Sequence, residues 1–226
     1  MKKPSNSFIE YTFRGNYFCL IPGYNTAFVV ISKTGATFLK KVAIYSKTGK
    51  WIQSSNETHT QVGFTESSEF FIPIHKISNY EKKHGKLLKF AVWRDPVERL
   101  ISGYKYFCLE KTYRPYFHAV GLYDNPSFDW FMKFVKFEIA KNDPQKQDPH
   151  IRRQSDHYQL NDVDYIIHMN DLFSFLEARQ IPFEREYSNR TNTHFKLKPK
   201  LYKWQIKYLY YDDYKLKVNW RNGQQP

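Results

Sequence analysis

A short apolar segment that leads directly into a strong helix start constrains the fold of this chain more than any other feature. Residues 87–93 are mostly apolar, which predicts a buried strand. Asp95 and Pro96 follow, and these are preferred residues for a helix N-cap and the first helical position. Arg94 then leaves the end of the strand, and Ser102 lies about two helical turns further on. An Arg and a hydroxyl beside a helix start suit a phosphate, because the fork of Arg matches its oxygens.

A second strand–turn–helix segment lies upstream. Residues 26–31 are β-branched and aromatic, as in a buried strand, and residues 38–45 are predicted to be helical. The turn Ser32-Lys-Thr-Gly-Ala-Thr37 would direct backbone N–H groups and the positive helix end toward an anion. Taken alone, this turn is better explained as an ordinary strand–helix connection with an exposed lysine. Its occurrence upstream of the first segment favours a phosphate site.

Together the two segments resemble a known family. The order Arg-Asp-Pro-x-x-Arg-x-x-Ser-x-Tyr at 94–104 resembles the 3'-phosphate motif of sulfotransferases that use the sulfate donor PAPS. The turn at 32–37 resembles the family's loop for the 5'-phosphosulfate, with Ser32 where the family often has Pro. The resemblance implies a P-loop-like α/β fold, with a central parallel sheet flanked by helices. It implies a metal-free donor site made by Lys33, Thr34, Gly35, Ala36, Thr37, Arg94 and Ser102.

The resemblance also implies a catalytic pair. In sulfuryl transfer an acceptor hydroxyl attacks sulfur, so a base must take its proton and a cation must stabilise the leaving phosphate oxygen. Lys33 is expected to be that cation. In uronyl 2-O-sulfotransferases a catalytic histidine follows an aromatic segment before the Arg-Asp-Pro motif, which implies that His75 is the base. The alternative for His75 is a buried structural role. His59 is predicted to be a loop residue, and His84 to lie on a solvated basic surface.

The segment 148–154 is predicted to be a loop. It resembles the Pro-His-Trp-x-Pro-Gln segment of chondroitin and related carbohydrate sulfotransferases, with Ile151 in place of Trp. Its residues His150, Arg152 and Arg153 are candidates to bind an acidic sugar, and a basic surface loop is an equally good interpretation. Downstream, residues 163–168 are predicted to form a strand and residues 170–179 a helix.

The loop at 188–196 resembles one that closes over the nucleotide in sulfotransferases. Its candidates for PAPS contact are Arg190, Thr193, His194 and Lys196, and the alternative is an ordinary loop of a cationic protein. Residues 201–214 are predicted to form a helix. Its packed face is expected to carry Leu201, Trp204, Tyr208 and Tyr211.

Length and composition favour one domain. The chain has 226 residues and no linker, repeat or low-complexity tract. We expect a single domain over 1–226, with an N-terminal hairpin at about 8–21, a donor-binding core at about 26–110 and acceptor and closing segments at about 111–216.

No apolar run approaches the ~20 residues of a membrane span, and the N-terminus lacks the apolar core of a signal peptide. We therefore predict a cytoplasmic enzyme, for which peripheral membrane contact stays open. Cys19 and Cys108 are predicted to be buried thiols.

The net charge of +13 predicts an anionic partner. Three function classes are compatible with it. The first is a PAPS-dependent carbohydrate O-sulfotransferase that acts on a uronate-containing or other acidic glycan and releases PAP. The second is a P-loop phosphotransferase, although the chain lacks Gly-x-x-x-x-Gly-Lys-[Ser/Thr]. The third is a non-enzymatic binder of heparin-like polymers or nucleic acid, although no recognised nucleic-acid motif appears. The order of Lys33, Arg94 and Ser102 favours the first class.

Overall fold

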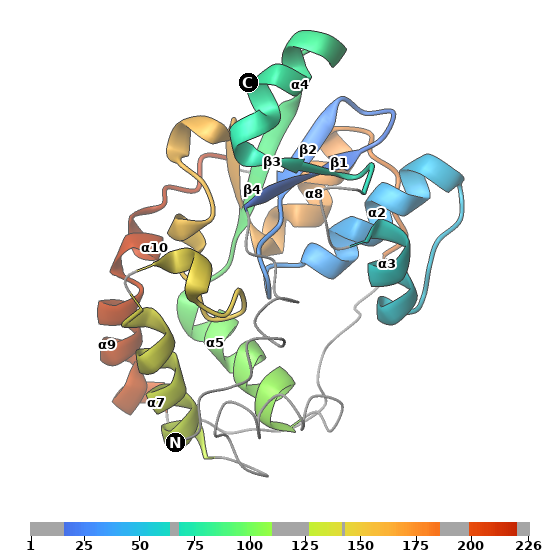
Figure 1. The fold of residues 1–226 in the computed structure, drawn as a ribbon. Coiled ribbons are helices and arrows are strands. Elements are labelled where there is room, and N and C mark those ends of the chain that lie inside the picture. Colours follow the sequence, from blue (N-terminus) through green and yellow to red (C-terminus); the bar gives the residue numbers. More distant parts are fainter. Residues whose placement is uncertain (1–15, 64–67, 110–126, 142, 186–198, 221–226) are drawn as a thin grey trace. The chain divides into compact units, whose positions relative to one another are not determined.

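This computed structural model describes residues 16–63, 68–109, 127–141, 143–185 and 199–220 (Figure 1). The chain forms two compact units, and each is described by itself. The sheet unit holds the described parts of residues 15–94, 154–190 and 216–226, and the helical unit holds those of 95–153 and 191–215. The single domain over 1–226, with its internal boundaries, stays a prediction. Positions 8–15 of the expected hairpin lie outside the described residues.

The sheet unit is built on five strands in the order β3-β1-β2-β4-β5. Their bounds are β1 Tyr17–Ile21, β2 Thr26–Val29, β3 Phe71–Pro73, β4 Leu88–Trp93 and β5 Tyr165–His168. Strands β2, β4 and β5 are parallel neighbours, and β1 runs antiparallel to both β2 and β3. The predicted α/β class is confirmed, with a mixed sheet around the predicted parallel centre. Because β3 runs in the same direction as β2, four strands end at one edge of the sheet.

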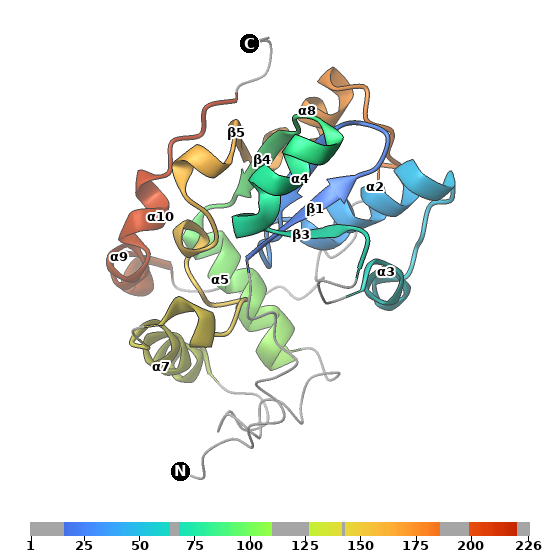
Figure 2. The same ribbon diagram turned by 45° about the horizontal axis from the view of Figure 1, so that its top comes forward.

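Helices cover both faces of this sheet (Figures 1 and 2). They are α2 Ala36–Thr48, α3 Ser55–Val62, α4 Ile77–His84 and α8 Leu172–Ala178, with short 3-10 turns at Ile74–Lys76, Gln154–Asp156, Leu160–Asp162 and Met169–Asp171. On one face Phe90 of β4 packs on Phe175 of α8, with ring centroids 4.9 Å apart. On the other face Ile77 of α4 joins a buried cluster with Ala91 and Ile166.

Two local predictions for the sheet unit can be compared with the structure. The prediction that His59 is a loop residue is wrong, because His59 lies on α3. The Ser54 side chain accepts a hydrogen bond from the Glu57 amide and so caps this helix, which the polar composition of the segment concealed. Cys19 of β1 is buried, as is Cys108 of the helical unit, which confirms the prediction for both thiols. Burial raises the pKa of each thiol to about 12.

The helical unit contains α5 Pro96–Tyr104, which continues into a π-helical turn at Lys105–Leu109, followed by α7 Phe128–Ile139, a 3-10 turn at Pro144–Lys146, α9 Pro199–Leu209 and α10 Tyr211–Lys215. Asp95 caps α5 as predicted, since its carboxylate accepts hydrogen bonds from the amides of Val97 and Glu98. Leu100, Phe131 and Tyr210 are fully buried in the aromatic core that joins α5, α7 and α9.

The predicted helix over 201–214 is present as α9 and α10, but the expectation for its packed face is wrong. Trp204, Tyr208 and Tyr211 are exposed, while Ile206 and Tyr210 are buried. The Tyr210 hydroxyl donates a 2.6 Å hydrogen bond to the Ile151 carbonyl, which fixes the buried face. The segment carries aromatic residues on two faces, so periodicity alone did not identify the one that packs.

Candidate functional site

The two segments predicted to bind the donor are in direct contact. β2 and β4 are adjacent and parallel, so the turn after β2 and Arg94 after β4 lie at the same edge of the sheet. The Arg94 guanidinium donates a 3.0 Å hydrogen bond from Nη1 to the carbonyl oxygen of Lys33. In α/β sheets, ligands bind outside the carboxyl ends of the parallel strands, which is where this contact lies.

The turn between β2 and α2 has an unusual backbone. Lys33 and Gly35 have positive φ angles of 67° and 86°. Gly tolerates such an angle without strain, whereas a lysine does not, so Lys33 is held there by its surroundings. The Thr34 side chain is buried, and its hydroxyl donates a 2.9 Å hydrogen bond to the Ile31 carbonyl. That hydroxyl therefore shapes the turn, which differs from the ligand contact expected of it.

The first turn of α2 completes this edge. Gly35 is its N-cap, and Ala36 and Thr37 are its first two residues. The opening amides of a helix have no carbonyl partner within the helix, and the dipole makes this end positive. The first turn contains no acidic residue. Amides, dipole and the cations of Lys33 and Arg94 thus present one sign of charge to a ligand.

The side chain of Gln154 holds Arg94 in place. Its Oε1 accepts a 3.0 Å hydrogen bond from the Arg94 amide, and its Nε2 donates a 2.9 Å hydrogen bond to the Arg94 carbonyl. Gln154 is 1% exposed, so this pairing is shielded from water. Gln154 is the last residue of the 148–154 segment, for which the sequence predicts only a loop. Its role was missed because its partner lies far away in the sequence.

Changing Gln154 to leucine is expected to weaken PAP binding by about tenfold or more. Leucine leaves both backbone groups of Arg94 without this partner, and an unsatisfied buried group costs about 1–3 kcal/mol. Isothermal titration with PAP measures the effect. The matched control is Gln147→Leu, since Gln147 is also buried and donates to the carbonyls of Ile139 and Lys141 in the helical unit. Both changes should lower the melting temperature, but only Gln154→Leu should change PAP affinity.

His75 lies at the same edge of the sheet unit. Pro73, the last residue of β3, pairs with Tyr17 of β1, and the Tyr17 carbonyl accepts from the amide of Val30 just after β2. His75 follows on the short 3-10 turn, so it lies at the same edge of the sheet as the 32–37 turn. The strands that lead to these two positions, β3 and β2, are two strand spacings apart, or roughly 10 Å. The His75 side chain is exposed, which argues against the buried structural role.

The remaining predicted site residues with described positions belong to the helical unit. Ser102 is half-buried on α5. His150 is partly exposed, and its Nδ1 lies 3.0 Å from Asp148 Oδ1. Arg153 donates from Nε to the Leu209 carbonyl at 2.7 Å. Arg152 is 1% exposed, which favours a structural role for it over the predicted contact with a sugar.

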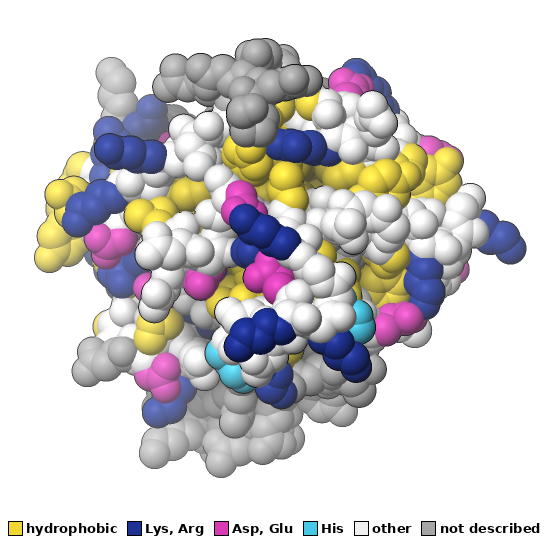
Figure 3. Space-filling view, turned by 90° about the horizontal axis from the view of Figure 1, so that it is seen from above, with side chains coloured by type: hydrophobic (Ala, Val, Ile, Leu, Met, Phe, Trp, Pro, Cys, Tyr) yellow, Lys and Arg dark blue, Asp and Glu magenta, His cyan; other side chains and the backbone are white. Residues whose placement is uncertain are grey.

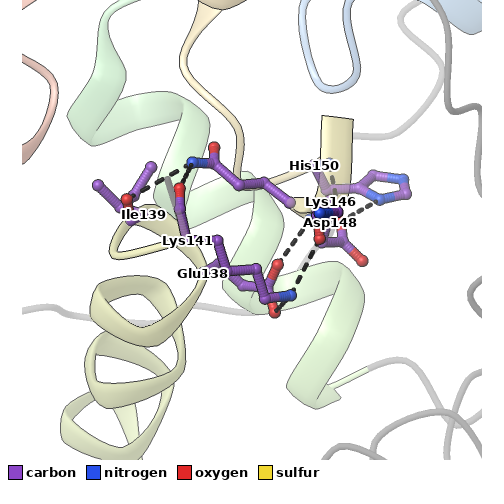
Figure 4. A network of polar contacts seen from close by, with 7 residues as sticks. Glu138, Ile139, Lys141, Lys146, Asp148 and His150 are labelled. Atoms are coloured by element: carbon purple, nitrogen blue, oxygen red, sulfur yellow. Dashed lines mark hydrogen bonds and ion pairs between the residues drawn. The ribbon is translucent and has the colours of Figure 1, made fainter. Parts of the chain in front are cut away.

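A polar network anchors the segment that carries His150 (Figure 4). The carboxylate of Glu138 accepts from Lys141 Nζ at 2.6 Å and from the Asp148 amide at 2.7 Å. The Asp148 carboxylate in turn accepts a 2.8 Å hydrogen bond from the His150 amide and contacts Nδ1 of the His150 ring. This second contact orients the imidazole. The His150 ring also stacks on Tyr106, with centroids 5.0 Å apart.

Arg99, the second arginine of the 94–104 motif, is fully buried. Its Nη2 donates to the Pro149 carbonyl at 3.3 Å, so it supports the 148–154 segment. Burial lowers the pKa of the Arg99 guanidinium, and the charges of Asp213 and Asp148 oppose that shift. This arginine is therefore a structural cation of the helical unit.

Four predicted contacts to the donor lie outside the described residues: Arg190, Thr193, His194 and Lys196. Within the described ranges, no group of three or more His, Cys, Asp and Glu side chains is arranged to hold a metal ion. Over the same ranges, none of the helices combines the length and apolar character needed to cross a bilayer.

Comparison with known proteins identifies one matching protein family. The model of the sulfotransferase family matches residues 16–216. Neither the curated proteins nor the solved structures gave a match. The family match includes β2 with its turn, Arg94 and Gln154, and it covers most of the chain. On this evidence the chain belongs to the sulfotransferase family, as the two motifs predicted.

Proposed function

We propose that this protein is a PAPS-dependent carbohydrate O-sulfotransferase. The observation that carries the proposal is the hydrogen bond from Arg94 to the Lys33 carbonyl, which joins the family's two phosphate-binding segments at one edge of the sheet. Membership of the sulfotransferase family supports sulfuryl transfer in general. The donor, the acceptor and the base are parts of the proposal.

The residues at the strand ends fit the phosphates of PAPS. Arg94 has further N–H donors beyond Nη1, and an arginine fork suits the 3'-phosphate. The amides of residues 34–37 and the positive end of α2 suit the 5'-phosphosulfate. In the proposed site Ser102 adds a hydroxyl to the 3'-phosphate. We expect no metal to be required, because nitrogen and oxygen donors of the chain hold both phosphates.

In the proposed reaction PAPS supplies the sulfuryl group. His75 accepts the proton of the acceptor hydroxyl as the new oxygen–sulfur bond forms. Lys33 stabilises the charge that develops on the phosphate oxygen as its bond to sulfur breaks. The products are the sulfated acceptor and PAP, with the proton left on His75 and then released to water. The acceptor is an acidic glycan, which the charge of +13 attracts.

A thermal-shift measurement tests the donor. At a hundredfold excess over its dissociation constant, PAP stabilises the folded state by about 2.7 kcal/mol, which raises the melting temperature of a chain of this size by roughly 5–10 °C. ATP, which lacks a 3'-phosphate, should give a much smaller shift. Equal shifts with ATP and PAP would favour a phosphotransferase instead.

Activity measurements complete the test. Incubation with PAPS and a panel of uronate- and hexosamine-containing glycans, followed by mass spectrometry, should reveal a sulfated product. Activity should survive EDTA, and a loss that magnesium restores would contradict the proposed mechanism.

A further inference from the structure

The helical unit exposes a row of aromatic side chains that its core does not use. On α9 and α10, Trp204 is 65% exposed, Tyr208 78% and Tyr211 61%. Ile206 and Tyr210 are buried on the opposite face, so the packing of the unit itself turns these rings outward. Single exposed apolar residues are ordinary, whereas a run of large exposed rings indicates an interaction surface.

Lysines accompany these rings. Lys203 and Lys207 are exposed and four residues apart, so they form a row beside Trp204 and Tyr208 on the same helix. The Lys215 ammonium lies 4.1 Å from the centroid of the Tyr211 ring. We call Lys203, Trp204, Lys207, Tyr208, Tyr211 and Lys215 the aromatic–lysine face.

Charge alone does not single out a binding surface. On the view in Figure 3, lysine and arginine side chains are spread among acidic ones. Within residues 202–215 the acids are Asp212, which pairs with Lys215 at 3.3 Å, and the buried Asp213. The aromatic–lysine face thus combines rings with an excess of positive charge, which makes it complementary to an anion.

We propose that the aromatic–lysine face binds an acidic glycan chain. A glycan offers apolar C–H faces to rings and carboxylates or sulfates to lysines, whereas Tyr and Trp keep polar atoms available for its hydroxyl groups. Lysines are depleted at protein–protein interfaces, and no aliphatic side chain is exposed among residues 202–215, so an anionic glycan suits this face better than an apolar protein partner. The inference rests on the proposed function in that it takes the acceptor to be an acidic glycan.

The experiment measures binding of a uronate polymer and of its disaccharide by titration calorimetry. The double variant Trp204→Ala/Tyr208→Ala should bind the polymer about tenfold or more weakly than the wild type, since exposed Trp and Tyr are frequent hot spots. Its affinity for the disaccharide should change little. Lys203→Gln/Lys207→Gln should weaken polymer binding mainly at low salt, because screening removes the contribution of exposed charges.

Two matched controls belong to the sheet unit. Leu160→Ala removes a 61% exposed apolar side chain, and Lys82→Gln/Lys83→Gln removes two exposed charges from α4. Neither should change polymer affinity. Melting temperatures should remain at the wild-type value throughout, because all the altered side chains are exposed.

Several results would overturn this inference. One is wild-type polymer affinity in Trp204→Ala/Tyr208→Ala. Another is a wild-type protein that binds phosphatidylglycerol vesicles through these rings but not the polymer. A third is self-association that the variant abolishes without any polymer binding. The PAP thermal shift, measured on the same samples, separates the two proposals. A missing PAP shift with intact polymer binding contradicts the proposed function alone. A normal PAP shift with polymer binding that is insensitive to the rings contradicts glycan binding by the aromatic–lysine face alone.

Discussion

Replacing His75 with alanine is expected to lower turnover by at least about two orders of magnitude, since a positioned base contributes about 10²–10⁴-fold. PAP affinity should be unchanged, because His75 is proposed to contact the acceptor proton and not the nucleotide. The melting temperature should also be unchanged, because the His75 side chain is exposed. Single-turnover rates with saturating PAPS measure the chemical step directly.

The matched control is His84→Ala. His84 is also exposed, lies at the end of α4 and stacks on Tyr80 with centroids 4.4 Å apart. It should retain wild-type turnover. His150→Ala should raise the apparent KM for the acceptor and leave the single-turnover rate at saturation nearly unchanged, if the 148–154 segment binds sugar. A folded His75→Ala protein with near-normal single-turnover chemistry would remove His75 from the mechanism.

Arg94→Ala is expected to weaken PAP binding by roughly 10- to 150-fold, since a charged hydrogen bond contributes about 1.5–3 kcal/mol. The structure adds a second reason for a large effect. Alanine also removes the donor to the Lys33 carbonyl, and Lys33 has a strained backbone that needs support. Ser102→Ala should have a smaller effect, because it removes only one neutral hydroxyl from the proposed site. Calorimetric titration with PAP measures both.

Arg94→Lys separates charge from geometry. A lysine keeps the charge but lacks the planar fork that can reach the Lys33 carbonyl and a phosphate together, so most of the affinity should still be lost. Arg179→Ala is the control, since Arg179 donates to the Tyr165 hydroxyl at the other end of β5. Wild-type PAP affinity in Arg94→Ala would show that the 3'-phosphate assignment is wrong.

The elements around Arg94 were predictable because their signals are local. An apolar run predicted β4, and Asp95 with Pro96 predicted the start of α5. The strand, turn and helix around Lys33 were predictable for the same reason, because their sequence patterns are also local. The pairing of β1 with β2 and β3 and the order of the sheet have no comparable signal, because strand pairing depends on contacts between distant parts of the chain.

The sequence predicts candidate site residues, but it does not predict how their side chains are arranged. Thr34 was expected to offer its hydroxyl to a ligand, whereas it donates to the Ile31 carbonyl. Arg152 was expected at a surface, yet it is buried. The contact between Gln154 and the backbone of Arg94 joins residues remote in sequence, and such side chain-to-backbone hydrogen bonds leave no periodic pattern. Burial of one polar residue rather than its neighbour is decided by tertiary packing.

The contact between Gln154 and Arg94 also has a consequence for how the chain folds. β4 and β5 are neighbours in the sheet, yet the whole of residues 95–153 lies between them in the sequence. Pairing them requires a long loop closure, whose entropic cost precedes any gain from the contacts, and such non-local pairing slows folding. The two hydrogen bonds of Gln154 fasten the ends of this loop at Arg94. The residue proposed to hold the 3'-phosphate would therefore reach its final position in the same late step that completes the sheet.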